Sequence, residues 1–125
     1  MRINHVAIWA ENLETLRSFY AKYFNGSCGK RYHNPLKGFT SYFITFDGRC
    51  RLELMCMDGI TQRQSRTLGL AHISFSVGGK ENVDELTERL RRDGYTIIGE
   101  PRTTGDGYYE SVIADPEGNI VEITI

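Results

Sequence analysis

The sequence carries almost no net charge and has no long hydrophobic run. Its 125 residues include 15 Lys and Arg against 16 Asp and Glu, a formal charge of −1. Binding to nucleic acid or to an anionic membrane uses an excess of basic residues, so the composition disfavours both roles. The longest apolar stretches, such as 73–77, have strand length, whereas a transmembrane helix needs about 20 apolar residues. Because the first residues also lack the apolar run of an export signal, we expect a cytoplasmic protein.

Cysteine is also scarce. The chain has three cysteines, Cys28, Cys50 and Cys56, and no C-x-x-C pair. An odd count at these spacings excludes a full disulfide framework and does not match the spacing of a structural zinc site. We therefore expect reduced cysteines in a single globular domain, because the length and the 40% hydrophobic content suit one compact core.

The most informative feature of the sequence is an internal repeat. Residues 3–10 (INHVAIWA) match residues 70–77 (LAHISFSV), and a polar break and a segment of helical periodicity follow each. Strand signals come next, at 40–46 and 50–57 in the first half and at 95–99, 108–114 and 119–125 in the second. A weaker strand signal lies at 29–32. We predict an α+β fold of two tandem βαβββ modules, each a curved mixed sheet with a helix on its convex face.

The repeat also predicts how the chain is divided. The two modules would cover 1–57 and 70–125, with a polar connector at 58–69, and together form one domain. Neither half alone can bury both faces of a four-stranded sheet, so the halves are expected to pair.

The two predicted helices have recognisable ends. Asn12 can cap the first helix, and Asn82 followed by Glu85 resembles a capping box at the start of the second. Gly26 and Gly94 lie just past the last periodic residues, where a left-handed C-terminal cap favours glycine.

Strand alternation separates an apolar face from a polar face in each half. The residues expected to be buried are Val6, Ile8, Leu52, Leu54, Ile73, Phe75, Val121 and Ile123. The opposite face carries one imidazole and one carboxylate per half: His5 and Glu53, then His72 and Glu122. The separations are 48 and 50 positions, so this constellation is itself repeated.

A repeated His and Glu pair suggests a metal site. If the first and last strands of each half are neighbours, a directly opposed His and Glu can share one ion. Two such pairs supply four ligands and leave room for water or substrate. Two imidazoles and two carboxylates favour one divalent ion of Ni, Co, Zn, Fe or Mn over calcium. The alternative is that these side chains are simply solvated, as a lone His or Glu on a sheet face usually is. Repetition of the pair argues against this alternative, but spacing alone leaves both interpretations open.

The chain resembles the vicinal oxygen chelate superfamily, which includes glyoxalase I, bleomycin-resistance, fosfomycin-resistance and dioxygenase-like proteins and methylmalonyl-CoA epimerase. The resemblance covers essentially the whole chain. The segments that carry it are 4–8 (NHVAI), 52–54 (LEL), 71–75 (AHISF), 115–119 (DPEGN) and 121–123 (VEI). The His-Glu-His-Glu set is most similar to the metal pattern of glyoxalase I, which implies that all four residues are metal ligands.

By this resemblance, the protein is expected to be a metal-dependent lyase or isomerase that moves a proton next to a carbonyl of a small chelated substrate. Glu122 is the expected base, and Glu53 is the symmetric candidate. Short members of the superfamily often pair modules across two chains, which implies a homodimer. The alternatives are an epimerase, although epimerases usually carry Gln where Glu53 stands, or a protein that sequesters an antibiotic or aromatic ligand.

One position departs from the glutathione-using relatives. They commonly carry Arg four residues after the first His, and this chain has Trp9 there. Glutathione use is therefore an open question. Trp9, Met55 and the Tyr108–Tyr109 pair suit a more apolar or aromatic substrate, or are packed aromatic residues.

Overall fold

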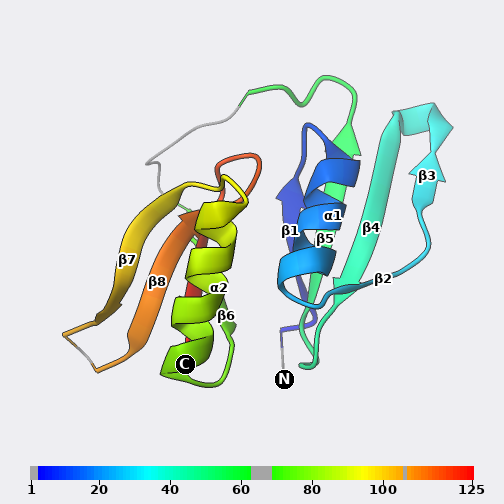
Figure 1. The fold of residues 1–125 in the computed structure, drawn as a ribbon. Coiled ribbons are helices and arrows are strands. Elements are labelled where there is room, and N and C mark those ends of the chain that lie inside the picture. The colour runs from blue at the N-terminus through cyan, green and yellow to red at the C-terminus, as the bar shows by residue number, and fades with distance from the viewer. Residues whose placement is uncertain (1–2, 63–68, 106) are drawn as a thin grey trace. The chain divides into compact units, whose positions relative to one another are not determined.

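The computed structural model describes residues 3–62, 69–105 and 107–125 and consists of two compact units, Met1–Gln64 and Ser65–Ile125 (Figure 1). The first unit contains β1 (His5–Trp9), α1 (Leu13–Tyr23), β2 (Ser27–Cys28), β3 (Tyr32–Asn34), the 3₁₀ helix η1 (Pro35–Lys37), β4 (Phe39–Thr45) and β5 (Arg51–Met57). The second contains β6 (Ile73–Ser76), α2 (Lys80–Arg92), β7 (Ile97–Thr103), β8 (Tyr109–Ala114) and β9 (Ile120–Thr124). The predicted connector 58–69 includes 63–68, which lie outside the described residues.

Each unit forms one mixed sheet. The strand order is β1-β5-β4-β2 in the first unit, with β3 paired to β4, and β6-β9-β8-β7 in the second. The pairs β1–β5 and β6–β9 are parallel, and the other pairs are antiparallel. This arrangement confirms the predicted α+β fold of two tandem βαβββ modules. The weak strand signal at 29–32 is misplaced, because 29–31 lie between two short strands, β2 and β3.

Helix α1 begins as predicted and ends differently. The Asn12 side chain accepts a hydrogen bond from the backbone N–H of Thr15 at 3.0 Å, which confirms the N-terminal cap. At the other end, the residue with positive φ is Asn25, at 53°, so the left-handed cap predicted at Gly26 is wrong. Gly26 is needed for a different reason, since a Cβ there would lie 2.5 Å from Cγ2 of Ile44.

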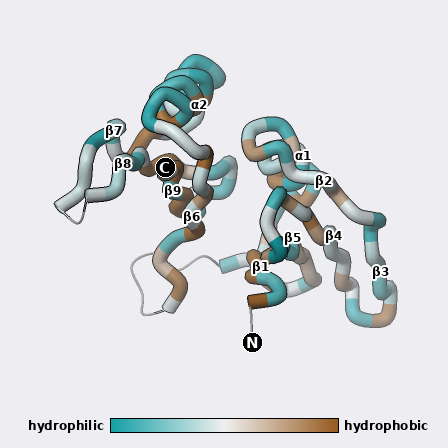
Figure 2. Tube along the Cα trace, turned by 90° about the horizontal axis from the view of Figure 1, so that it is seen from below, coloured by the Kyte–Doolittle hydropathy of each residue, from teal (hydrophilic) through white to brown (hydrophobic). Residues whose placement is uncertain are grey.

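Helix α2 begins two residues earlier than the predicted capping box. Its N-cap is Gly79, which has no side chain to cap with, and Asn82 instead donates from Nδ2 to the carbonyl of Val77 at 2.7 Å. The capping box at Asn82 and Glu85 is therefore wrong. Gly94 has a φ of 87°, which confirms the predicted left-handed end. Figure 2 shows α2 as a mostly hydrophilic helix, because only a narrow stripe of it meets the sheet.

The core of each unit lies between the helix and one face of the sheet. Five of the residues predicted to be buried are buried: Ile8, Leu52, Leu54, Val121 and Ile123. The other three, Val6, Ile73 and Phe75, are only half-buried. They lie on β1 and β6, the edge strands of their sheets, which have a neighbouring strand on one side only.

Two further expectations concern cysteines and membranes. All three cysteines are free thiols, as predicted. Among the helices that the structure describes, none has the length and apolar character needed to cross a membrane.

Candidate functional site

The first candidate pair, His5 and Glu53, lies on neighbouring parallel strands. In the β1–β5 register Glu53 is directly opposite Ala7, so His5 lies two residues from direct opposition on the same face. The Nε2 atom of His5 is 3.7 Å from Oε2 of Glu53. The histidine side chain is 39% exposed and the glutamate 15%, so the pair meets solvent at the surface of the sheet.

The second pair, His72 and Glu122, repeats this geometry within its own unit. Glu122 is directly opposite Ser74 in the β6–β9 register, and His72 again precedes that position by two residues. The Nε2 atom of His72 is 3.3 Å from Oε2 of Glu122. The side-chain exposures, 43% and 20%, are close to those of the first pair.

The structure corrects one detail of the predicted pairing. Each imidazole meets its carboxylate diagonally across the strands and does not lie directly opposite it. The residues that do lie opposite the carboxylates are small, Ala7 and Ser74. A small residue at this position leaves room for the imidazole and the carboxylate to lean toward one another along the strands.

The hairpin before β9 helps to position Glu122. The buried carboxylate of Asp115 accepts hydrogen bonds from the backbone N–H groups of Glu117 and Asn119 and from the side-chain amide of Asn119, at 2.7–3.0 Å. Gly118 supplies the positive φ, 78°, that closes this turn. The turn between β8 and β9 therefore has a fixed conformation, which helps to set the register of β9 against β8.

Each pair has a spacing that suits two ligands of one ion. Imidazole nitrogen and carboxylate oxygen both bind zinc-sized ions at about 2.0–2.2 Å, which places two tetrahedral ligand atoms roughly 3.3–3.6 Å apart. The observed separations, 3.7 and 3.3 Å, lie close to that range. Within 3–62, 69–105 and 107–125, no three His, Cys, Asp or Glu side chains gather in one place. Each unit thus offers a pair of ligands and not a complete metal centre.

The surroundings of His5 include three residues, Asn4, Phe43 and Arg51, that were not among the predicted site residues. Asn4 Oδ1 lies 2.9 Å from Nδ1 of His5 and 2.7 Å from Nη2 of Arg51. The Phe43 ring meets the imidazole edge-on, with the ring centroids 5.3 Å apart. The Arg51 guanidinium lies 4.3 Å from the centroid of the Phe43 ring. A signal for Arg51 was present in the sequence, because it is two residues from Glu53 and therefore on the same strand face.

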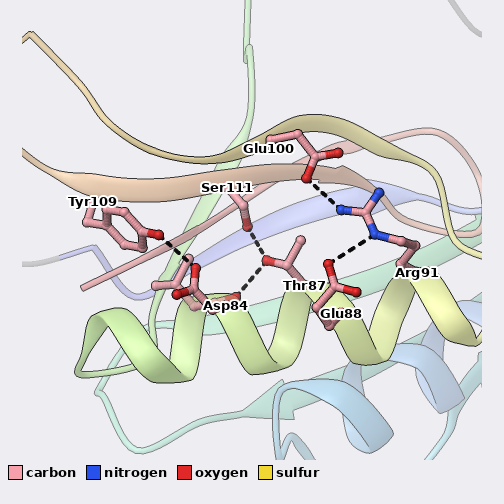
Figure 3. Close-up of polar contacts among 8 residues, drawn as sticks. Asp84, Thr87, Glu88, Arg91, Glu100, Tyr109 and Ser111 are labelled. Carbon is pink, nitrogen blue, oxygen red and sulfur yellow. Dashed lines mark hydrogen bonds and ion pairs between the residues drawn. The ribbon is translucent and has the colours of Figure 1, made fainter.

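The aromatic residues proposed to contact substrate do not all lie on this face. The Tyr109 hydroxyl donates to the Asp84 carboxylate on α2 at 2.8 Å, which places Tyr109 on the helix-covered side of its sheet (Figure 3). Of the two interpretations of Tyr109, this contact favours a packed aromatic residue. Trp9 shares the strand face of His5, is 42% exposed, and meets Phe39 edge-on at 6.3 Å.

Comparison with known proteins agrees with this architecture. A stretch of 59 residues is 36% identical to the uncharacterized protein YqjT of Bacillus subtilis (strain 168), and covers 45% of this chain and 46% of that protein. The crystal structure of a glyoxalase family protein from Enterococcus faecalis matches with a TM-score of 0.81 at 27% identity, over 99% of this chain and 97% of the other.

A trypanothione-dependent glyoxalase I from Leishmania major has the same fold, with a TM-score of 0.81 at 22% identity over 99% of this chain and 86% of that one. The family model described as Glyoxalase/Bleomycin resistance protein/Dioxygenase superfamily matches residues 2–123. Because that match spans nearly the whole chain, the protein belongs to the Glyoxalase/Bleomycin resistance protein/Dioxygenase superfamily.

Proposed function

We propose that the protein is a metal-dependent lyase or isomerase of the glyoxalase I type, acting next to a carbonyl of a small chelated substrate. The observation that carries the proposal is the repeated His–Glu pair, with the same diagonal offset and similar exposure in both units. Solvated side chains have no physical reason to repeat this arrangement, whereas shared ligation of one ion accounts for it.

In this proposal His5, Glu53, His72 and Glu122 hold one divalent ion. The mixed nitrogen and oxygen donors suit Ni, Co, Zn, Fe or Mn. The bound ion supplies Lewis-acid stabilisation of the negative charge that develops on a carbonyl oxygen when the adjacent carbon loses its proton.

The carboxylates supply the proton transfer. Glu122 would take the proton from the hydroxyl-bearing carbon next to the carbonyl and deliver it to the former carbonyl carbon, while the hydroxyl proton passes to the former carbonyl oxygen. Glu53 is the symmetric candidate for this base. Both carboxylates are partly accessible, at 20% and 15% side-chain exposure, so a substrate on this face can reach them. A positioned general base accounts for about 10²- to 10⁴-fold of a rate enhancement.

The proposal is tested first by elemental analysis of untagged protein and by titration of the metal-free chain with each of the five ions. The loaded protein is then assayed with methylglyoxal and glutathione, and for deuterium exchange next to the carbonyl of candidate substrates. We expect Glu122→Gln, at saturating metal, to lower the rate about 10²- to 10⁴-fold. The control is Glu81→Gln, an exposed carboxylate on α2, which should leave the rate unchanged. A wild-type protein that binds none of these ions contradicts the proposal.

A second candidate function is supported by aromatic residues on the strand face that carries His5. Trp9, Phe39 and Tyr32 form a chain of ring contacts, with centroids 6.3 and 6.0 Å apart, and both Trp9 and Tyr32 are exposed. Such a surface suits a protein that sequesters a planar ligand. Trp9 is the only tryptophan, so its fluorescence reports directly on this surface. Tight quenching by an aromatic ligand, unchanged in Glu122→Gln and without bound metal, favours this candidate over the enzyme.

A further inference from the structure

We infer that Asn4, held by Arg51, is a positioning residue that keeps the proton of His5 on Nδ1 and so leaves Nε2 free to bind a metal ion. The inference rests on the proposed function and extends it to residues outside the ligand set. It follows from the hydrogen-bonding chemistry of three neighbouring side chains.

Arg51 determines which atom of the Asn4 amide faces it. A guanidinium group has only donors, and Nη2 of Arg51 lies 2.7 Å from the Asn4 side chain. The contacting atom must therefore be the acceptor Oδ1, since the amide nitrogen would place two donors against each other. The usual ambiguity in orienting an asparagine amide is thus removed by its partner.

Asn4 in turn determines the tautomer of His5. The same Oδ1 lies 2.9 Å from Nδ1 of His5, and an oxygen that only accepts requires Nδ1 to donate. A neutral imidazole carries one N–H, so Nε2 is left with a lone pair. That lone pair faces Oε2 of Glu53 at 3.7 Å, which is too long for a hydrogen bond. Two acceptors that face each other repel, and a cation bound between them removes this repulsion.

Arg51 is itself held in place by two further contacts. Its backbone N–H donates to the carbonyl of Asn4 at 3.1 Å, and its guanidinium lies 4.3 Å from the Phe43 ring. Phe43 is directly opposite Glu53 in the β4–β5 register and also contacts the His5 ring. The residues around the imidazole therefore restrict both its tautomer and its orientation, as the outer partners of metal-binding histidines do.

The second unit offers a built-in comparison. His72 is preceded by Ala71, and the position two residues before Glu122 is Ile120. Neither residue can accept from or orient an imidazole through its side chain. The two halves of the proposed metal site are therefore chemically unequal, because the side chains next to His72 cannot hold its proton on Nδ1 as Asn4 holds that of His5.

The test combines the tautomer of the metal-free protein with metal affinity. Long-range ¹H–¹⁵N spectra, recorded where both imidazoles are neutral, should show the wild-type His5 proton on Nδ1. Asn4→Ala should convert His5 to a tautomer mixture, leave the His72 signals unchanged, and weaken metal binding about 10- to 100-fold. Asn4→Asp keeps the acceptor and should preserve both the tautomer and the affinity to within a few-fold. The His72 signals also report whether the fold is retained.

The outcomes separate this inference from the proposed function. A His5 proton on Nε2 in the wild type overturns the inference, and so does metal binding by Asn4→Ala with wild-type affinity. A wild-type protein that binds no divalent ion overturns the proposed function, and with it the role of Asn4 toward a metal.

Discussion

Glu14 is an exposed carboxylate that links helix α1 to the sheet of the first unit. It accepts a hydrogen bond from the Tyr42 hydroxyl at 2.7 Å and another from Arg17 at 2.8 Å. The Tyr42 hydrogen bond is the main reason that the pKa of Glu14 lies below its usual value, and Arg17 adds to the effect. Because the folded pKa is lowered, this link stabilises the fold above the usual carboxyl pKa and is lost as pH falls through the lowered value.

We expect Tyr42→Phe to raise the pKa of Glu14 toward the usual carboxyl range, because the largest contribution to its lowering is removed. A carboxyl ¹³C titration of the Glu14 signal measures this shift. Tyr109→Phe is the matched control, since Tyr109 makes the equivalent hydrogen bond to Asp84 in the other unit. A Glu14 signal that titrates at the same pH in wild type and Tyr42→Phe contradicts the assignment.

Helix α2 and strand β8 are joined by a buried polar contact, shown in Figure 3. The Thr87 hydroxyl lies 2.6 Å from the Val83 carbonyl and 2.7 Å from the Ser111 hydroxyl, and both side chains are fully buried. Thr87 has one proton, which it donates to Val83, so Ser111 must donate to Thr87. The contact fixes the helix against the strand that carries Val112, which is directly opposite Glu122 in β9.

Replacing one partner of this contact should cost more than replacing both. Thr87→Val leaves the Ser111 hydroxyl buried without its acceptor, which should lower the free energy of unfolding by about 1–3 kcal/mol. Adding Ser111→Ala removes that unsatisfied group, so the double variant should lose less than the sum of the single variants. Urea denaturation of the four proteins measures the coupling, with Thr61→Val at an exposed position as the control. Additive losses would show that the two hydroxyls do not interact energetically.

For the molecule as a whole, we expect a homodimer with two equivalent metal sites. Among the residues that the structure describes, each unit supplies one His–Glu pair, so a four-ligand site of this kind needs a pair from each kind of unit. Closed two-fold dimers are the commonest homo-oligomers. Such a dimer contains two His–Glu pairs of each kind, which is enough for two four-ligand sites.

Mixing two inactive variants tests whether each site combines two chains. His5→Ala and Glu122→Ala each remove one ligand, and a mixed dimer with cross-chain sites has one intact and one doubly damaged site. Activity should therefore reappear after subunit exchange, at up to half the wild-type rate per mixed dimer. Verified mixed dimers without activity would place each site within a single chain, and a monomer in sedimentation analysis would contradict the dimer itself.

The fold and the candidate site residues were largely predictable from the sequence because the same order of elements occurs in both halves of the chain. Period-two alternation separated Ile8 and Leu54 from His5 and Glu53, and the observed registers place them on opposite faces. Local end signals were less dependable. Asn12 caps α1, but Asn82 does not cap α2, because the helix already begins at Lys80 and Asn82 lies inside it.

The sequence by itself determined the order of elements, the two sheets and the four candidate ligands, since these follow from short-range periodicity and repetition. Only the tertiary structure decided how side chains meet across strands. The diagonal offset of each His–Glu pair, the placement of Tyr109 against α2, and the contact of Asn4 with both Arg51 and His5 all depend on strand register. In the parallel pairs β1–β5 and β6–β9, register depends on packing between segments far apart in the chain, and no local pattern contains that information.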